Sequence, residues 1–402
     1  MVSGGADASI RLWDLENRAS ELSYLYQPVA SVSKQTNALA HTHALTSLSI
    51  YPFDPTPSTI LSTAHDKTLK LSSLGQSDIT PVHSFDLHST PYSHSLSSHP
   101  SSHLLIGVGT SEKAVRLLDL RSGLCTHSLP AHTAAVLSVT WAPHNPHLIA
   151  SASKDNQVVI FDVRRGSRTS AIASLDMDDS VGIVPSNSPG VRKPYSSSSR
   201  AHNSAVTGVR WTSDGAYLIT AGQDSRIRVW NASTGANTMV HFGPRIRNSP
   251  SLHFAERAPL VLPENNSNTN TLQAGHEMII WPNYNDPDDR GEIFMFEIRD
   301  GNFIKQLRAP GLLSRQKLRG RSTALTAARI NALAWRGNGG SGAGMEMYSA
   351  HGDGTIRAWA SRTREDEELE SESTVEKEEK KRKRNILDEV YRDLMQPGIT
   401  FT

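Results

Sequence analysis

Histidines are the residues of this sequence whose number and spacing could support metal chemistry. There are 17 of them, including His41 and His43 two positions apart and a series at His94, His99 and His103. Zinc sites combine such histidines with cysteines or carboxylates at fixed spacings. Here no cluster of carboxylates accompanies them, so we expect no metal site.

Nucleophilic and phosphate chemistry have equally little support. Cys125 is the only cysteine, and Gly337 to Gly344 is rich in glycine but lacks a following Lys-Ser or Lys-Thr pair. A cysteine outside any motif favours a strand residue over a nucleophile and fits a reducing compartment. A glycine run without that pair is no phosphate loop. We therefore expect no catalytic residue, no cofactor and no enzyme.

Polar residues at a fixed spacing are the stronger signal. In five places a Ser or Thr is followed after four positions by Asp, and after six more by an aromatic residue or its replacement. The sets are Ser3, Asp7, Trp13; Ser62, Asp66, Ser72; Ser151, Asp155, Phe161; Thr220, Asp224, Trp230; and Ser349, Asp353, Trp359. A recurring period of this kind indicates a repeat architecture.

A histidine opens three of these copies, at His41, His132 and His202. The turn Asp can bond to the His, the His to the hydroxyl, and the hydroxyl to an indole N–H, so every buried polar group gains a partner. This arrangement resembles the structural tetrad of WD-repeat propellers. The residues expected to form it are His202, Thr220, Asp224, Trp230, His132, Ser151, Asp155, His41, Ser62, Asp66, Ser349, Asp353 and Trp359.

Short strands must position these residues. Ala201 to Asn231 alternates apolar and polar residues between Gly, Asp and Ser turns, which is typical of an antiparallel meander. Two copies are degenerate: residues 85–120, with Glu112 and Leu118 at the Asp and aromatic positions, and residues 252–307. Counting them predicts an all-β, seven-bladed WD-repeat β-propeller over residues 1–360.

The first blade is expected to be truncated. Met1 lies six residues before Asp7, so its first and second strands should lack residues and leave an open edge. We expect an incomplete or shortened start; alternatively, residues 385–402 cover that edge.

Two further segments differ in composition from the repeats. Residues 176–200 are rich in Ser, Pro and Gly and predict a disordered insert. Residues 361–402 form a charged tail, in which residues 385–396 have the spacing of a short amphipathic helix. The basic run Lys380, Lys381, Arg382, Lys383 and Arg384 is a candidate nuclear import signal, or else a solvated part of a charged helix.

Overall charge names no partner. With 41 basic and 40 acidic residues among 402, and 37% hydrophobic residues without a membrane-length apolar run, we expect neither a membrane nor direct nucleic-acid binding.

Several strings are similar to one family, the Cockayne syndrome A protein and its fungal relatives. They include SGGADASIRLWDLEN (residues 3–17), PYSHSLSSH (91–99), VRLLDLRSGLCTHSLPAH (115–132) and residues 201–243. The resemblance covers most of residues 2–245, thins from 246 to 360 and is absent from the tail. It implies a non-catalytic substrate receptor of a cullin-four RING ubiquitin ligase, acting in the nucleus in transcription-coupled nucleotide excision repair.

The resemblance also implies partners and a docking signature. The partners are the damaged-DNA-binding adaptor of the ligase and repair proteins associated with stalled polymerase. The signature ends in aromatic-Asp-x-Arg, which Phe161, Asp162 and Arg164 match, with a weaker copy at Asp119 and Arg121. Family members also carry a helical segment before the first blade that contributes to docking, and this sequence lacks it.

Two alternatives remain open. Arg164 can pair with Asp162 and touch no partner. The whole chain can be a nuclear scaffold in chromatin or RNA processing without a ligase, using the propeller and the basic run.

Overall fold

The structure of the protein is a computed structural model. It describes residues 1–15, 25–54, 56, 58–75, 78–102, 104–166, 169–179, 195–246, 248, 260–262, 278–282, 292–308, 330–338 and 345–360. Contacts divide the chain into two units, one of residues 1–18, 25–333 and 349–357, the other of residues 19–24, 334–348 and 358–402.

Every regular element among the described residues is a β-strand. The strands are β1 (Val2–Gly4), β2 (Ile10–Trp13), β3 (Pro28–Val32), β4 (Leu45–Ile50), β5 (Thr59–Ala64), β6 (Thr68–Leu74), β7 (Ile79–Asp86), β8 (Pro91–Leu96), β9 (Leu105–Thr110), β10 (Ala114–Asp119), β11 (Leu124–Pro130), β12 (Val136–Trp141), β13 (Leu148–Ser153), β14 (Val158–Asp162), β15 (Ala171–Ser174), β16 (Val206–Trp211), β17 (Tyr217–Gly222), β18 (Arg226–Asn231), β19 (Leu260–Leu262), β20 (Met278–Pro282), β21 (Glu292–Glu297), β22 (Phe303–Arg308), β23 (Ile330–Asn338), β24 (Met345–His351) and β25 (Ile356–Ala360).

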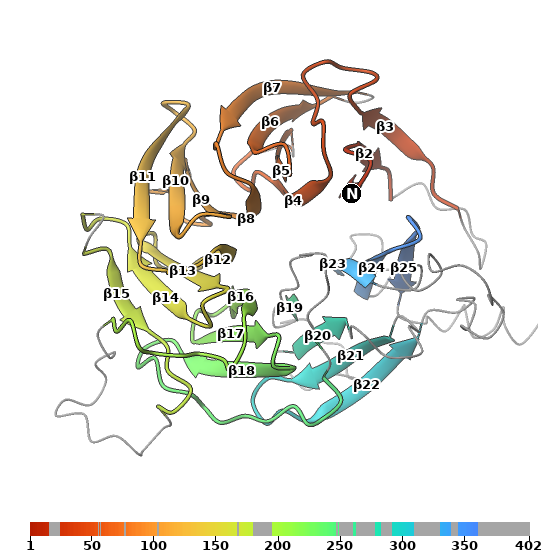
Figure 1. Ribbon diagram of the computed structural model, residues 1–402. Helices are drawn as coiled ribbons and strands as arrows, with labels where there is room; N and C mark the ends of the chain where they lie inside the picture. Colours follow the sequence, from red (N-terminus) through yellow and green to blue (C-terminus); the bar gives the residue numbers. More distant parts are fainter. Residues whose placement is uncertain are drawn as a thin grey trace, which may run out of the picture. The chain divides into compact units, whose positions relative to one another are not determined.

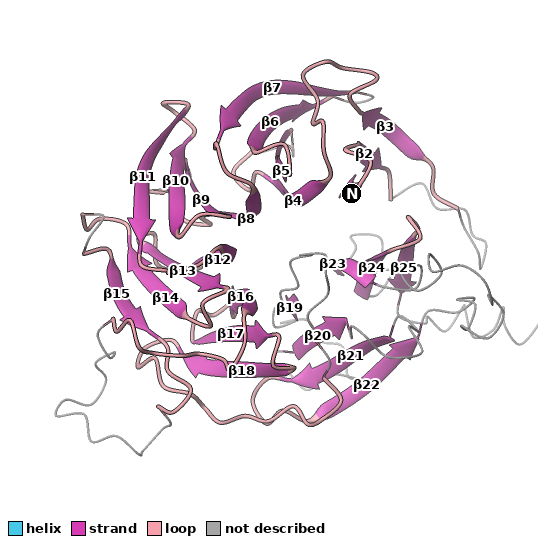
Figure 2. Ribbon diagram, in the orientation of Figure 1, coloured by secondary structure: helices cyan, strands magenta, loops and turns pink. Residues whose placement is uncertain are grey.

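These strands form seven small sheets in the described part of the chain, each a run of consecutive strands (Figure 2). Four sheets have four strands and three have three, in the orders β1-β2-β3, β4-β5-β6-β7, β8-β9-β10-β11, β12-β13-β14-β15, β16-β17-β18, β19-β20-β21-β22 and β23-β24-β25. Neighbouring strands pair antiparallel, as in the registers Ser151 with Val159 and Thr220 with Arg228. The predicted all-β fold of antiparallel meanders is thereby confirmed, and closure into seven blades stays a prediction.

Burial within a sheet follows the position of the strand. All five residues of β14 are buried, whereas β11, an outer strand, has only Leu129 buried among its seven residues. A strand covered on both faces needs a continuous apolar run, and an edge strand does not. This difference explains why Val158-Val159-Ile160-Phe161 is uninterrupted and Leu124–Pro130 is largely polar.

The first strands of consecutive sheets contact one another in the larger unit. β4 contacts β8, β8 contacts β12, and β12 contacts β16. Figure 1 shows β7, β11 and β15 at the opposite edge of the sheets that begin with β4, β8 and β12. Side chains fill the space between sheets: Trp211 and Trp230 pack in one cluster with Ala150, Val158 and Ile160 of the preceding sheet. Packing between neighbours, rather than within one sheet, therefore provides the core.

One turn recurs in five of the sheets. The residue after the turn Asp has a positive φ, at Ala8, Lys67, Asn156, Ser225 and Gly354. The Asp carboxylate accepts the backbone N–H two residues on, at 3.0 Å in Asp7–Ser9 and 3.2 Å in Asp224–Arg226. Such an Asx turn reverses the chain between the second and third strands. The regular Ser/Thr-to-Asp spacing thus records one turn geometry used repeatedly.

The structure corrects two expectations from the sequence. Residues of the first blade's second strand are present, since Val2–Gly4 forms β1 and pairs with β2. The ends of the 176–200 insert are packed: Tyr195 donates its hydroxyl to the Ala131 carbonyl at 2.7 Å, and Ser199 is buried. Polar side chains at these ends find backbone partners, which the composition did not predict.

Several predicted features lie outside the described residues. They are the basic run 380–384, the helix 385–396, the rest of the charged tail from residue 361, residues 180–194 of the insert, and His103.

Candidate functional site

Arg164 and Asp162 form the centre of the candidate docking site. Asp162 ends β14, and Arg164 follows it in the turn toward β15. Arg164 donates through Nε to Asp162 Oδ1 at 3.1 Å and through Nη2 to Oδ2 at 2.9 Å, while its backbone N–H donates to Oδ1 at 3.0 Å. This two-pronged geometry fixes the plane of the guanidinium.

The pair is exposed on one side only. The Arg164 side chain is 65% exposed and that of Asp162 only 8%. Hydrogen bonds from Arg164 lower the pKa of the Asp162 carboxyl below its usual value and outweigh the opposing effect of burial. The carboxylate therefore stays charged and holds a cation whose outer face is open to solvent. The pairing left open by the sequence exists, and it orients Arg164 without covering it.

Phe161 corrects one predicted role. Its side chain is fully buried and lies edge-on to His132, with ring centroids 6.4 Å apart. A partner docking on the folded protein cannot reach it. Its contribution is to packing in the core between the strands.

Asp119 and Arg121 repeat the backbone geometry without the ion pair. The Arg121 N–H donates to Asp119 Oδ1 at 2.9 Å, in the same way as Arg164 does to Asp162. Arg121 is exposed, and within the described chain no salt bridge to its guanidinium is present. Because β10 and β14 are the third strands of neighbouring sheets, these two arginines follow equivalent strand ends.

The expected hydroxyl, His and Asp sets come together in three sheets. His202 Nε2 lies 2.8 Å from Thr220 Oγ1 and its Nδ1 lies 3.0 Å from Asp224 Oδ1, while Trp230 Nε1 donates to the same hydroxyl at 2.9 Å. A neutral imidazole satisfies this chain, donating from Nδ1 and accepting at Nε2. The other two sets are His132 with Ser151 and Asp155, and His41 with Ser62 and Asp66.

The first and last copies are partial. Trp13 donates its indole N–H to Ser3 at 2.8 Å, and Asp7 accepts from Ser9. In the last copy Ser349 bonds to His351 at 2.9 Å, while Asp353 accepts from Thr355. His351 lies at the end of β24, the same strand as Ser349, so here the histidine does not come from a segment before the first strand. Trp359 is part of β25.

Burial and hydrogen bonding act in opposite directions on these groups. Burial opposes ionisation of Asp224, but the bonds from His202 and Arg228 prevail and lower the pKa of its carboxyl. Asp66 and Asp155 follow the same balance, with His41 and His132 as the donors that lower the pKa. Burial lowers the pKa of His202. The His202 set is thus a carboxylate with a neutral ring, which favours a structural role over proton transfer.

A basic residue four positions after the turn acid is a feature that the spacing analysis missed. Arg11 pairs with Asp7 at 3.0 Å, Arg116 with Glu112 at 2.7 Å and Arg228 with Asp224 at 2.9 Å. The period of two along a strand places both residues at the same edge of the turn. The signal was present in the sequence as Asp-x-x-x-Arg, and it is retained at Glu112, where the acid itself is atypical.

The described residues show no feature of a metal site or of a membrane-spanning helix. They contain no group of three or more His, Cys, Asp or Glu side chains able to hold a metal ion. They also contain no helix with the length and apolarity to cross a membrane.

Comparison with known proteins identifies the repeat. The family described as "WD domain, G-beta repeat" matches residues 33–71, 123–162 and 194–231. The WD repeat-containing protein ATCSA-1 of Arabidopsis thaliana is 28% identical over 298 residues, which cover 60% of this chain and 65% of that protein. The ribosome biogenesis protein YTM1 of Phaeosphaeria nodorum is 27% identical over 219 residues, covering 53% of this chain and 43% of the relative.

A third relative is similar at lower identity. Protein tipD of Dictyostelium discoideum is 23% identical over 266 residues, covering 60% of this chain and 39% of its own length. The chain thus spans 39% to 65% of the lengths of these three relatives. Together with the antiparallel sheets and their turns, these matches show that the chain carries WD40 repeats in a WD β-propeller fold and is homologous to WD repeat-containing proteins.

Proposed function

We propose that this chain is a non-catalytic substrate receptor of a cullin-four RING ubiquitin ligase, acting in the nucleus in transcription-coupled nucleotide excision repair. The observation that carries the proposal is the Arg164–Asp162 pair, in which a 65% exposed guanidinium is held by two hydrogen bonds to an 8% exposed carboxylate. A cation held in one orientation loses little conformational freedom when a partner binds.

The similarity to ATCSA-1 supports the same proposal, because it extends over 60% of the chain. In the proposed complex, Arg164 and Arg121 contact carbonyl or carboxylate oxygens of the damaged-DNA-binding adaptor. Substrates associated with stalled polymerase bind elsewhere on the propeller, and the chain itself performs no chemistry. The residues 380–384 would serve nuclear import.

Co-purification with the adaptor tests the docking residues. We expect the wild-type chain to retain the adaptor and the double variant Arg121→Ala, Arg164→Ala to lose it. Arg165→Ala is the matched control, because Arg165 is 57% exposed and its Nε is 3.8 Å from Asp162, too far for a hydrogen bond. Equal retention of the adaptor by the double variant and the control would rule out this docking surface.

A second candidate is a nuclear scaffold in chromatin or RNA processing that works without a ligase. The similarity to the ribosome biogenesis protein YTM1 favours it. RNA binding that weakens steeply with salt and disappears when residues 380–384 are deleted would support the scaffold. Adaptor binding that persists without those residues would support the receptor.

A further inference from the structure

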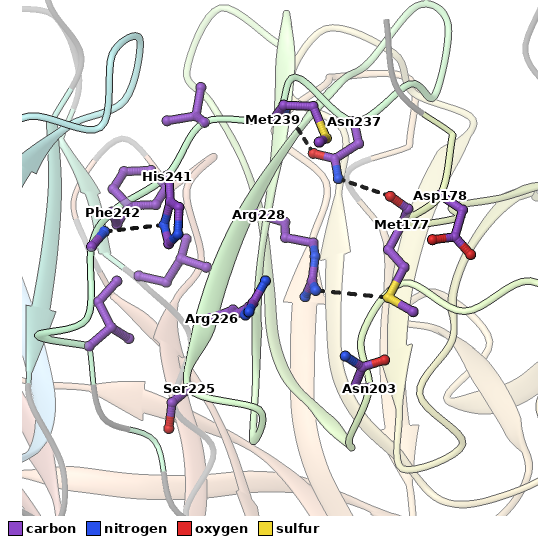
Figure 3. Close-up of a pocket in the computed structure, with 14 residues that line it drawn as sticks. Met177, Asp178, Asn203, Ser225, Arg226, Arg228, Asn237, Met239, His241 and Phe242 are labelled. Carbon is purple, nitrogen blue, oxygen red and sulfur yellow. Dashed lines mark hydrogen bonds between the residues drawn. The ribbon is translucent and has the colours of Figure 1, made fainter. Parts of the chain in front are cut away.

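A pocket of about 340 Å³ lies beside the His202–Asp224 set in the larger unit. Its walls are the start of β18, the segment Asn237–Ile246 that follows this strand, and residues 177 and 178 (Figure 3). The volume is at the small end of the roughly 300–1,000 Å³ of small-molecule pockets. It suits one side chain of a partner better than a large cofactor.

Arg228 supplies a buried cation to the wall of this pocket. The residue is 8% exposed, and its Nη1 donates to Asp224 Oδ2 at 2.9 Å and lies beside the His202 ring. Its Nη2 reaches Met177 Sδ at 3.8 Å, as the dashed line in Figure 3 marks. A thioether is a weak acceptor. Among the described residues, no oxygen is hydrogen-bonded to this charged nitrogen.

Nη2 of Arg228 therefore lacks a strong hydrogen-bond acceptor. Buried charged groups are normally paired and fully hydrogen-bonded, because an unmet donor carries a desolvation penalty. Asp224 cannot serve as this acceptor, since it already accepts from His202, from Nη1 of Arg228 and from two backbone N–H groups. An anion entering the pocket would accept from Nη2.

A second guanidinium lies at the opening of the pocket. Arg226 lines the pocket with an exposed side chain, and the described chain contains no salt bridge to it. Asp178 is the one acidic side chain among the lining residues, and it is exposed. Asp224 balances the charge of Arg228, so Arg226 and Asp178 are the exposed charges of the lining.

Apolar side chains also line the pocket, and hydrogen bonds hold its walls in place. Met177, Met239, Phe242 and Ile246 line the pocket. The buried Asn237 holds two walls together, donating from Nδ2 to the Met177 carbonyl at 3.3 Å and accepting the Met239 N–H at 3.0 Å. Met239 is held with a positive φ of 61° and 64% exposed. A methylene stem could lie against these side chains while its charged end meets the arginines.

We propose that this pocket binds an acidic side chain of an extended peptide from a partner protein, with Nη2 of Arg228 and the guanidinium of Arg226 as anion donors. The anion is a carboxylate or the phosphate of a phosphorylated residue, since both accept from guanidinium groups. The site lies at the starting end of a third strand, whereas Arg164 follows the finishing end of one. It does not depend on ligase association.

Saturation-transfer NMR with synthetic peptides tests the proposal. The probes are blocked five-residue peptides of sequence Gly-Leu-X-Leu-Gly, in which X is Glu, phosphoserine or Gln, titrated against the full chain. We expect the Glu or the phosphoserine peptide to bind about tenfold more tightly than the Gln peptide. Saturation should be strongest at the side chain of X. The stronger of the two acidic peptides identifies the anion.

Variants of lining residues distinguish binding in the pocket from general electrostatic attraction to the protein. Arg226→Ala should weaken the preferred acidic peptide about fivefold, and Asp178→Asn should tighten it, because the first removes an attraction and the second a repulsion. Both residues are exposed, so both variants should fold, unlike substitutions of the buried Arg228. Lys113→Ala removes an exposed charge elsewhere and should change nothing. Equal binding of the Glu, phosphoserine and Gln peptides, or equal effects of Arg226→Ala and Lys113→Ala, would overturn the proposal.

Discussion

The hydroxyl of Ser93 on β8 accepts a hydrogen bond from the backbone N–H of Val139 on β12, at 2.9 Å. Ser95 does the same for the N–H of Trp141, also at 2.9 Å, and Ser138 on β12 does so for Val209 on β16 at 3.3 Å. A first strand is the edge of its sheet, and its outward N–H groups would otherwise be buried without partners. Serines at alternate positions of the preceding first strand satisfy them.

Replacing Ser93 by Ala should therefore destabilise the fold. The change leaves the buried Val139 N–H without its acceptor, and we expect a loss of about 1–3 kcal/mol in the free energy of unfolding. Urea denaturation followed by fluorescence measures it. Ser128→Ala, on the exposed outer strand β11, is the matched control and should change little. A Ser93 variant as stable as this control would show that the inter-sheet bond contributes nothing.

Thr220→Val tests the hydroxyl at the centre of the best-formed set. Valine keeps the shape of the side chain but removes the oxygen that Trp230 Nε1 and His202 Nε2 both contact. Both groups are fully buried, so we expect a loss of about 3 kcal/mol in the free energy of unfolding. Thr80→Val, an exposed substitution on β7, provides the baseline. The expectation fails if the two variants melt at the same urea concentration.

The buried His94 should make stability depend on pH at values above those at which the carboxylates titrate. Burial lowers its pKa to about 4 from the ordinary 6.5. As the pH falls below 6.5, the unfolded chain takes up the proton and the folded chain does not. His94 therefore makes its full contribution to the free energy of unfolding above pH 6.5. This contribution is lost as the pH falls toward 4, by about 3 kcal/mol in all.

Denaturation curves at several pH values between 7 and 4 measure this loss. In the His94→Gln variant, the free energy of unfolding should change less steeply with pH over this range, because the titrating group is gone. His88→Gln changes a side chain that is 78% exposed and should keep the wild-type slope. A His94→Gln protein with that same slope would place the acid sensitivity elsewhere.

Much of the fold followed from the sequence because one turn imposes a strict spacing. Asp66, Asp155 and Asp224 all accept from the backbone N–H two residues on, and the third strand begins there. This local rule leaves a regular signature that survives where the partner residues vary, as at Ser72 and Phe161.

Features that depend on neighbouring sheets could not be read in the same way. The family resemblance placed Phe161 in the docking signature, but its side chain is fully buried and lies edge-on to His132. Ser93 and Ser95 looked like polar residues of a resembling string, and only the placement of β12 beside β8 shows what they bond to. The cation at Arg228 became a candidate anion donor because Met177 faces it from another loop.

The affinity of the Arg164→Lys variant for the adaptor tests the account most directly. Lysine keeps the charge but cannot form the two-pronged pair that orients the guanidinium on Asp162. In an equilibrium binding measurement on the purified full chain, we predict about tenfold weaker binding than wild type, with Arg165→Lys unchanged. Wild-type affinity in Arg164→Lys would contradict docking through this pair.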